Sequence, residues 1–202
     1  MGVLGPRASR NHTGVRDFIM MKSFAKVFTV IGGLLVTFMT VGFLLPGTWS
    51  AEAAIEVPAE PEAVFPLLDD LGRWEEWTQW AEIESTLSDP PFGSGATRSW
   101  EDVQYGSGSV TIIESRPPEL VRYQVGIGDG AGVIGTLRLT ASPNGSLVTW
   151  TEEGDFGRNP LMGYVARTMS ESQGQQLVES LERLKDVVGL GPPGSPRSRS
   201  SG

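Results

Sequence analysis

The stretch from Asn159 to Val188 constrains the fold most, because it carries the one long helical pattern in the globular part of the chain. Asn159 followed by Pro160 is typical of a helix start, and Gly189 stands where a glycine cap would end the helix. Apolar residues recur at three- and four-residue steps between these ends, which places one apolar stripe along the helix. The stripe consists of Leu161, Val165, Met169, Leu177, Leu181, Leu184 and Val188. A stripe of this length needs a partner surface.

Short segments of alternating polar and apolar residues supply that surface. Ala53–Val57 predicts a first strand and Pro61–Leu68 a helix, and the three-residue spacing of Trp74, Trp77 and Trp80 predicts a short helical segment with these rings on one side. Further strands are expected over 82–88, 96–103, 107–115, 119–127, 132–141 and 146–155. We therefore expect an α+β fold, in which a curved antiparallel sheet of about seven strands wraps on a long C-terminal helix.

An uncharged 19-residue run, Val27–Leu45, follows Lys22 and Lys26. As a helix it spans about 28 Å, close to the hydrocarbon thickness of a bilayer. We expect a transmembrane anchor over 23–47, with a cytoplasmic N-terminus and an extracytoplasmic domain because the positive charges precede the run. The alternative is a signal peptide cleaved near Ala53, which would release the domain as a secreted protein.

The remaining boundaries follow from composition. Residues 1–19 show no periodicity, so we expect a disordered leader over 1–22, and Met20 or Met21 as the true start of translation. Residues 190–202 are rich in Gly, Pro, Ser and Arg and are expected to be disordered. Residues 52–189 are expected to form one domain.

The charge distribution and the residue types that are missing exclude several functions. Residues 52–189 carry nine Lys/Arg and 23 Asp/Glu, so this domain should be repelled by nucleic-acid phosphates. The chain has no cysteine, and its single histidine, His12, precedes the domain. We therefore expect no metal site, no cofactor and no catalysis by cysteine or histidine.

Several short segments, in a particular order, carry a family resemblance. They are Ile55–Phe65, the cluster Trp74–Trp77, Gly95–Trp100, Gly106–Gly108 at the start of a strand, Val148–Trp150 and Leu181–Lys185. Together they resemble the START-related helix-grip superfamily, also called SRPBCC or the polyketide cyclase and lipid-transport group. The apolar run that ends just before the first strand is similar to that of anchored members. The resemblance implies a cavity between the last helix and a bent sheet, which holds a hydrophobic or amphipathic small molecule.

Strand alternation predicts which side chains face that cavity. The expected ligand-binding residues are aromatic or methionine side chains, which suit apolar ligands; they are Trp77, Trp100, Tyr123, Trp150, Phe156, Met162 and Met169. Arg98, Asp102 and Glu152 could form a polar hook inside the cavity, and buried charges of this kind need partners. The alternatives are a packed core without a ligand and strands that expose the polar set to solvent.

The favoured hypothesis is a membrane-anchored, non-enzymatic binding domain for a lipid or other hydrophobic small molecule. One alternative is a cyclase- or dehydratase-like enzyme that uses Asp102, Glu152 or Tyr123. The other is an interaction module whose acidic surface binds a basic protein near the membrane. A carboxyl in the cavity with a raised pKa would favour the enzyme.

Overall fold

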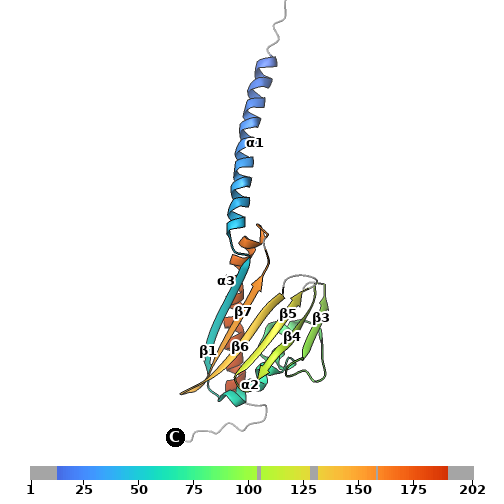
Figure 1. Ribbon diagram of the computed structural model, residues 1–202, viewed down its shortest axis with the longest axis vertical. Coiled ribbons are helices and arrows are strands. Elements are labelled where there is room, and N and C mark those ends of the chain that lie inside the picture. The colour runs from blue at the N-terminus through green and yellow to red at the C-terminus, as the bar shows by residue number, and fades with distance from the viewer. Residues whose placement is uncertain (1–12, 104–105, 128–131, 158, 191–202) are drawn as a thin grey trace, which may run out of the picture.

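The structure is a computed structural model that describes residues 13–103, 106–127, 132–157 and 159–190. It contains the expected curved antiparallel sheet of seven strands, in the order β1-β7-β6-β5-β4-β3-β2, with a long C-terminal helix lying across it (Figure 1). The elements are α1 (Thr13–Leu44), β1 (Thr48–Val57), α2 (Pro61–Asp69), the 3₁₀ turns η1 (Arg73–Glu76) and η2 (Gln79–Glu82), β2 (Ser85–Leu87), β3 (Thr97–Asp102), β4 (Gly106–Arg116), β5 (Leu120–Ile127), β6 (Gly132–Ser142), β7 (Gly145–Asp155) and α3 (Met162–Leu190).

Strand β1 begins earlier than the sequence pattern indicates. It pairs with β7 from Thr48 opposite Asp155 to Val57 opposite Ser146, so the predicted start at Ala53 lies in the middle of a continuous ladder. The early residues were missed because they follow directly on the apolar run. A tight turn at Asn144-Gly145 connects β6 to β7, and Gly145, with a φ of 137°, opens β7.

Both ends of α3 can be compared with the prediction. The cap at Asn159 is confirmed, because the Leu161 N–H donates a hydrogen bond of 3.0 Å to Asn159 Oδ1. The predicted cap at Gly189 is wrong, because the helix continues through Gly189 to Leu190. A single glycine costs a helix about 1 kcal/mol and does not by itself end it.

The apolar stripe of α3 packs on the core from Met169 onward but not at the start of the helix. Leu177, Leu181 and Leu184 are buried, whereas Leu161 and Val165 are 47% and 43% exposed, so the stripe prediction is wrong for these two. The first turns bury Gly163 and Ala166 instead. This end of α3 packs closely on the end of α1, where a Cβ at Gly163 would collide with the side chain of Leu45.

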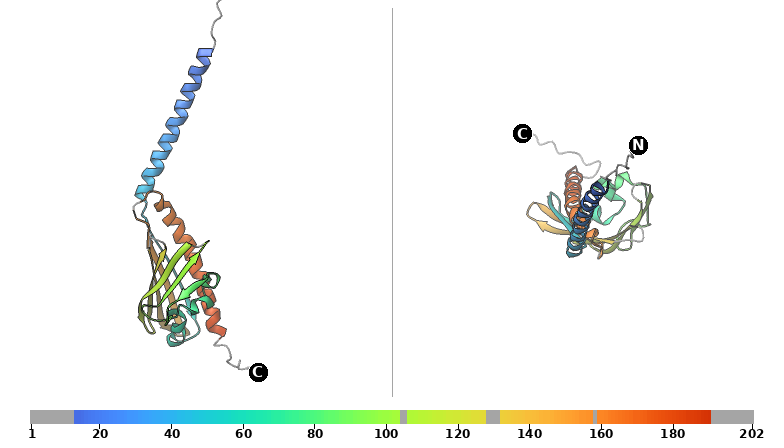
Figure 2. Two further views of the ribbon diagram at one scale, coloured as in Figure 1. Left: turned by 90° about the vertical axis from the view of Figure 1, so that its right-hand side faces the viewer. Right: turned by 90° about the horizontal axis from the view of Figure 1, so that it is seen from above.

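Helix α1 stands clear of the sheet and meets the domain only near its C-terminal end (Figures 1 and 2). The ring of Phe38 stacks on Tyr164 of α3 at 4.6 Å, and the Tyr164 hydroxyl donates to the Phe38 carbonyl at 2.9 Å. The helix includes residues 13–22 of the expected leader, while residues 1–12 and 191–202 lie outside the described part. Within the described residues, no helix combines the length and apolar content needed to cross a membrane. The anchor therefore stays a prediction.

The short helical segment expected around the tryptophans consists of two 3₁₀ turns, η1 and η2. Thr78 separates them, and its side chain accepts from the Trp80 N–H at 3.2 Å. Trp74 and Trp77 are buried, and their indole N–H groups donate to the carbonyls of Leu68 and Leu67. Trp80 is half-buried. The turns η1 and η2 thus lie beside the sheet as a separate layer. We call the part formed by η2, which carries Trp80, the η2 wall.

Candidate functional site

A pocket of about 200 Å³ lies between η2, β7 and α3. This pocket borders both the C-terminal helix α3 and the buried aromatic ring of Trp150. Its apolar lining residues are Trp80, Ile83, Trp150 and Leu177, and its polar lining residues are Thr78, Gln79, Gln173, Gln176 and Ser180.

Larger hollows exist elsewhere on the described surface. One of about 540 Å³ lies at the junction of α1 and β1, and another of about 580 Å³ lies near Trp49 and Ser170. None of the predicted ligand-binding residues lines either hollow. The pocket at η2, β7 and α3 is therefore the candidate site, although it is smaller.

Packed aromatic rings form the interior behind this pocket. The ring of Trp77 meets Trp150 edge-on at 5.4 Å, and Trp74 meets Tyr123 edge-on at 4.9 Å. Trp77, Trp74 and Tyr123 are at most 1% exposed. These side chains fill much of the space between helix and sheet, which explains why the pocket at its border is small.

A chain of buried hydrogen bonds runs from the pocket into this interior. The Trp150 indole N–H donates to Tyr123 Oη at 2.7 Å, and the Tyr123 hydroxyl donates a short hydrogen bond to Glu152 Oε1. Gln173 Nε2 on α3 donates to Glu152 Oε2 at 2.6 Å. Trp150 and Gln173 are also pocket-lining residues, so this chain connects two points of the pocket through a carboxyl group.

Burial governs the acid–base properties of this chain. It raises the pKa of Glu152 above its ordinary value of 4.5, although the hydrogen bonds from Tyr123 and Gln173 act in the opposite direction. Burial also raises the pKa of Tyr123 well above 10.0, and the neighbouring Glu152 carboxylate adds to this effect. A carboxyl of raised pKa beside a pocket can donate a proton to a bound molecule.

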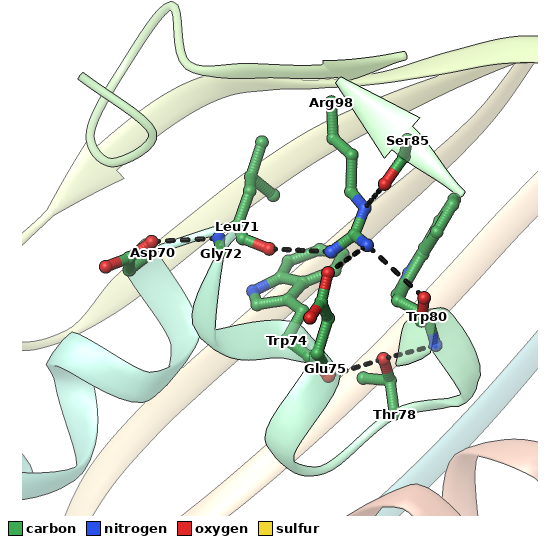
Figure 3. Close-up of polar contacts among 9 residues, drawn as sticks. All are labelled: Asp70, Leu71, Gly72, Trp74, Glu75, Thr78, Trp80, Ser85 and Arg98. Carbon is green, nitrogen blue, oxygen red and sulfur yellow. Dashed lines mark hydrogen bonds and ion pairs between the residues drawn. The ribbon is translucent and has the colours of Figure 1, made fainter. Parts of the chain in front are cut away.

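A second buried polar cluster centres on Arg98 of β3 (Figure 3). Its guanidinium donates to Ser85 Oγ at 2.7 Å, to the Leu71 carbonyl at 3.1 Å and to the Trp80 carbonyl at 3.2 Å. It also forms an ion pair with Glu75 at 2.6 Å and lies 5.1 Å from the ring centre of Trp80. Arg98 is fully buried. These bonds fix η1 and η2 against the sheet and so position the Trp80 wall of the pocket.

The predicted ligand-binding residues do not all reach one pocket. Trp150 lines the candidate pocket, and Trp77 and Tyr123 lie in the interior behind it. Trp100 packs edge-on against Trp80 at 5.0 Å, on the far side of the η2 wall. Phe156 and Met169 are partly buried at the edge of the core, and Met162 begins α3.

The three residues of the predicted polar hook are not brought together. Arg98 and Glu152 are both buried and both paired, but with different partners. Asp102 lies at the end of β3 opposite Gly106. Strands β4, β5 and β6 lie between β3 and β7 in the sheet, and Arg98 and Glu152 do not bond to each other.

Sequence reasoning missed Gln173, which contacts Glu152 and lines the pocket. A signal was present, because Gln173 lies four residues after Met169 and four before Leu177, in the middle of the apolar stripe. A polar residue in such a stripe needs a buried partner. Among the described residues, no group of three or more acidic or histidine side chains could hold a metal ion.

A curved antiparallel sheet that encloses a long C-terminal helix, with a pocket beneath that helix, defines a helix-grip domain. The model of the family described as polyketide cyclase / dehydrase and lipid transport matches residues 48–189, and the chain belongs to this family. This confirms the resemblance seen in the sequence. A search of curated proteins gives no significant match.

Solved structures show the same fold. Protein CV1439 from Chromobacterium violaceum is 18% identical with a TM-score of 0.52, over 69% of this chain and 96% of its own. SA2116 from Staphylococcus aureus is 11% identical with a TM-score of 0.56, over 71% and 94%. The di-domain ARO/CYC StfQ from the steffimycin biosynthetic pathway is 10% identical with a TM-score of 0.55, over 71% and 51%. At these identities the likeness establishes the fold alone.

Proposed function

We propose that the domain binds a small amphipathic molecule in the pocket between η2, β7 and α3. The observation that carries this proposal is that the pocket ends on the buried chain of Trp150, Tyr123, Glu152 and Gln173. Membership in a family described by cyclase, dehydrase and lipid transport activities supports it. A buried carboxyl with two donors is costly to maintain in a core that only has to pack.

The pocket restricts the size of that molecule. Ligand pockets for drug-sized molecules measure about 300–1,000 Å³, and this one measures about 200 Å³. A whole lipid would require the packed rings of Trp77 and Tyr123 to move. The ligand that we propose is therefore smaller than the lipid expected from the resemblance.

A pair of neighbouring substitutions on α3 tests the proposal. Gln176 is exposed and lines the pocket, whereas exposed Gln175 faces a different hollow with Glu52 and Glu171. Gln176→Trp should cover the pocket, and Gln175→Trp adds the same bulk beside it. We expect mass spectrometry of extracts from the purified full chain to show a small molecule with the wild type and Gln175→Trp, and much less with Gln176→Trp. Equal extracts from all three proteins would contradict binding in this pocket.

A second candidate function is catalysis by Glu152 as a general acid. The raised pKa of Glu152 and its hydrogen bond from Tyr123 favour it. In a dehydration, Glu152 would donate its proton to a hydroxyl, whose C–O bond breaks to release water. The Glu152 carboxylate left behind would take a proton from the neighbouring carbon, and a carbon–carbon double bond forms. The substrate extracted from Glu152→Gln would then be one water heavier than the product extracted from the wild type. An identical molecule in both extracts would favour binding without catalysis.

We also propose that α1 attaches the domain to a membrane, with the N-terminus cytoplasmic and the domain outside. The uncharged run Val27–Leu45 supports this, as do the exposed apolar side chains of α1 such as Phe28 and Leu34. Cleavage after Ala53 would cut β1 within its ladder to β7, which favours a retained helix over a cleaved signal.

Vesicle flotation and cysteine labelling test the attachment. The chain has no cysteine, so Glu179→Cys on exposed α3 creates a single labelling site. We expect the full chain to float with vesicles and this site to react with an impermeant thiol reagent added outside intact cells. A chain that stays in the soluble fraction would contradict attachment, and a site protected from the reagent would contradict the orientation.

A further inference from the structure

The lining of the candidate pocket carries no charged side chain, although the domain as a whole is strongly acidic. Its polar lining residues are hydroxyls and amides, which can both donate and accept hydrogen bonds. The side-chain amides of Gln79 and Gln176 make no hydrogen bond to the described part of the chain, so both are free to bind a ligand.

Two ionisable side chains, Glu152 and Arg183, do not line the pocket but form hydrogen bonds to residues that do. Glu152 is hydrogen-bonded by Gln173, and Arg183 donates to Ser180 Oγ at 3.1 Å and to the Trp77 carbonyl at 3.2 Å. Each makes hydrogen bonds to the protein, and neither side chain lines the pocket. A charged ligand would therefore lose its hydration without meeting a counter-charge in the lining, which is costly.

The apolar lining residues come from three sides of the pocket. Trp150 is 6% exposed and borders the pocket from β7, while Leu177 is 1% exposed and borders it from α3. Trp80 forms part of the η2 wall. Flat aromatic walls combined with neutral amides suit a ring that carries hydroxyl or carbonyl groups.

The volume limits the ligand to about one ring. The pocket of about 200 Å³ is smaller than the range of about 300–1,000 Å³ of pockets that hold drug-sized molecules, so we expect it to enclose about one substituted six-membered ring.

We propose that the ligand of this pocket is an uncharged molecule of one ring, with an apolar face against Trp150 and hydroxyl or carbonyl groups bound by the glutamine amides. This inference rests on the proposed function and specifies its ligand class.

Three probes of nearly equal size and different charge test the inference: benzyl alcohol, benzoate and benzylammonium. Each is titrated into the full chain in detergent micelles, and the indole N–H signals of the six tryptophans are followed by NMR. We expect benzyl alcohol to bind with a Kd in the millimolar range, as suits so small a molecule, and to shift the signals of Trp80 and Trp150. The two ions should bind at least tenfold more weakly. These shifts should persist in Gln175→Trp and vanish in Gln176→Trp, whereas shifts from partition into the micelle would be the same in both.

Other results of these titrations would overturn the inference alone or the proposed function as well. Benzoate binding as tightly as the alcohol would mean that Arg183 reaches the ligand, and equally tight benzylammonium would mean that Glu152 does; either result overturns the inference. If none of the three binds but dodecanol shifts Trp150 in the same variant-dependent way, the inference fails while the proposed function stands. If no probe shifts Trp80 or Trp150, both fail.

Discussion

The ring of Tyr123 lies directly over Gly135, its partner on the neighbouring strand β6, at a position where a Cβ on Gly135 would overlap the ring. The glycine thus allows Tyr123 to lie flat on the sheet with its hydroxyl beside Glu152. Trp100 over Gly108 and Trp49 over Gly154 repeat the arrangement on other strand pairs. Cross-strand pairs of glycine and an aromatic ring therefore shape the interior of this sheet.

Substitution of Gly135 should destabilise the domain. In Gly135→Ala the added methyl group must displace the Tyr123 ring, and overpacking of this kind costs about 1–3 kcal/mol. Gly126→Ala on β5 is the control, because the space above Gly126 is open and its nearest neighbour is Ser109 Oγ at 4.0 Å. Chemical denaturation should show the loss in Gly135→Ala alone. Equal effects of the two substitutions would contradict the role of the glycine.

The stability of the domain should depend on pH through Glu152. The pKa of Glu152 in the folded state lies above its unfolded value of about 4.5. The contribution of Glu152 to folding stability is therefore fully present below about pH 4.5. It is lost as the pH rises through the folded pKa, because the carboxyl group then ionises in the interior. Glu152→Gln does not titrate, so its stability relative to the wild type should increase as the pH is raised from 4.5 towards neutral. Each unit between the folded and unfolded pKa contributes about 1.4 kcal/mol. Glu153→Gln, at an exposed position of the same strand, is the control, and parallel pH profiles of the two variants would contradict the assignment.

Gln173 should stabilise the ionised form of Glu152. Gln173→Leu keeps a side chain of similar size but removes the donor to Glu152 Oε2, and a hydrogen bond to a charged group contributes about 1.5–3 kcal/mol. The loss in unfolding free energy should be largest at neutral pH and shrink in acid, where Glu152 is protonated in both proteins. Gln175→Leu, at an exposed position, should change stability by less than about 0.5 kcal/mol. A loss that is independent of pH would indicate packing instead.

Arg98 should contribute more stability than the other Arg–Glu pair of the η1 turn. Arg98→Met leaves the carbonyls of Leu71 and Trp80 without this donor, and an acceptor left unsatisfied in the interior costs about 1–3 kcal/mol. Arg73→Met breaks the pair with Glu76, whose side chains are 40% and 42% exposed, and should cost less than about 1 kcal/mol. Urea denaturation distinguishes these values. Similar losses would contradict the role of Arg98 as the group that fixes the η2 wall.

The arrangement of strands and helices could be predicted because it depends on local periodicity. Alternation located the strands β3 to β7 to within a few residues. It also predicts that Val148, Trp150 and Glu152 share one face of β7, and all three side chains are buried. The cap at Asn159 was also a local signal. Local patterns failed where a neighbour in space decides the outcome, as at Leu161 and Val165, where α1 replaces the sheet as the packing partner of α3.

The site could be predicted only in part, because it depends on distances across the sheet. Alternation showed that Arg98 and Glu152 could both point inward, but it could not show that three strands separate them. The expected cavity came from the family resemblance, and the sequence does not reveal that the edge-on contacts of Trp77 and Tyr123 fill most of that space. Of the predicted ligand-binding residues, Trp150 lines the pocket, and the interruption of the apolar stripe by Gln173 was a further signal in the sequence.

Isothermal titration calorimetry with the molecule extracted from the purified wild-type chain measures binding in the candidate pocket. We expect the molecule to bind with a stoichiometry of one per chain to ligand-free wild type and to Gln175→Trp. We expect no heat of binding with Gln176→Trp, whose added ring covers the pocket next to Trp150 and Leu177. Undiminished one-to-one binding to Gln176→Trp would show that the molecule binds elsewhere.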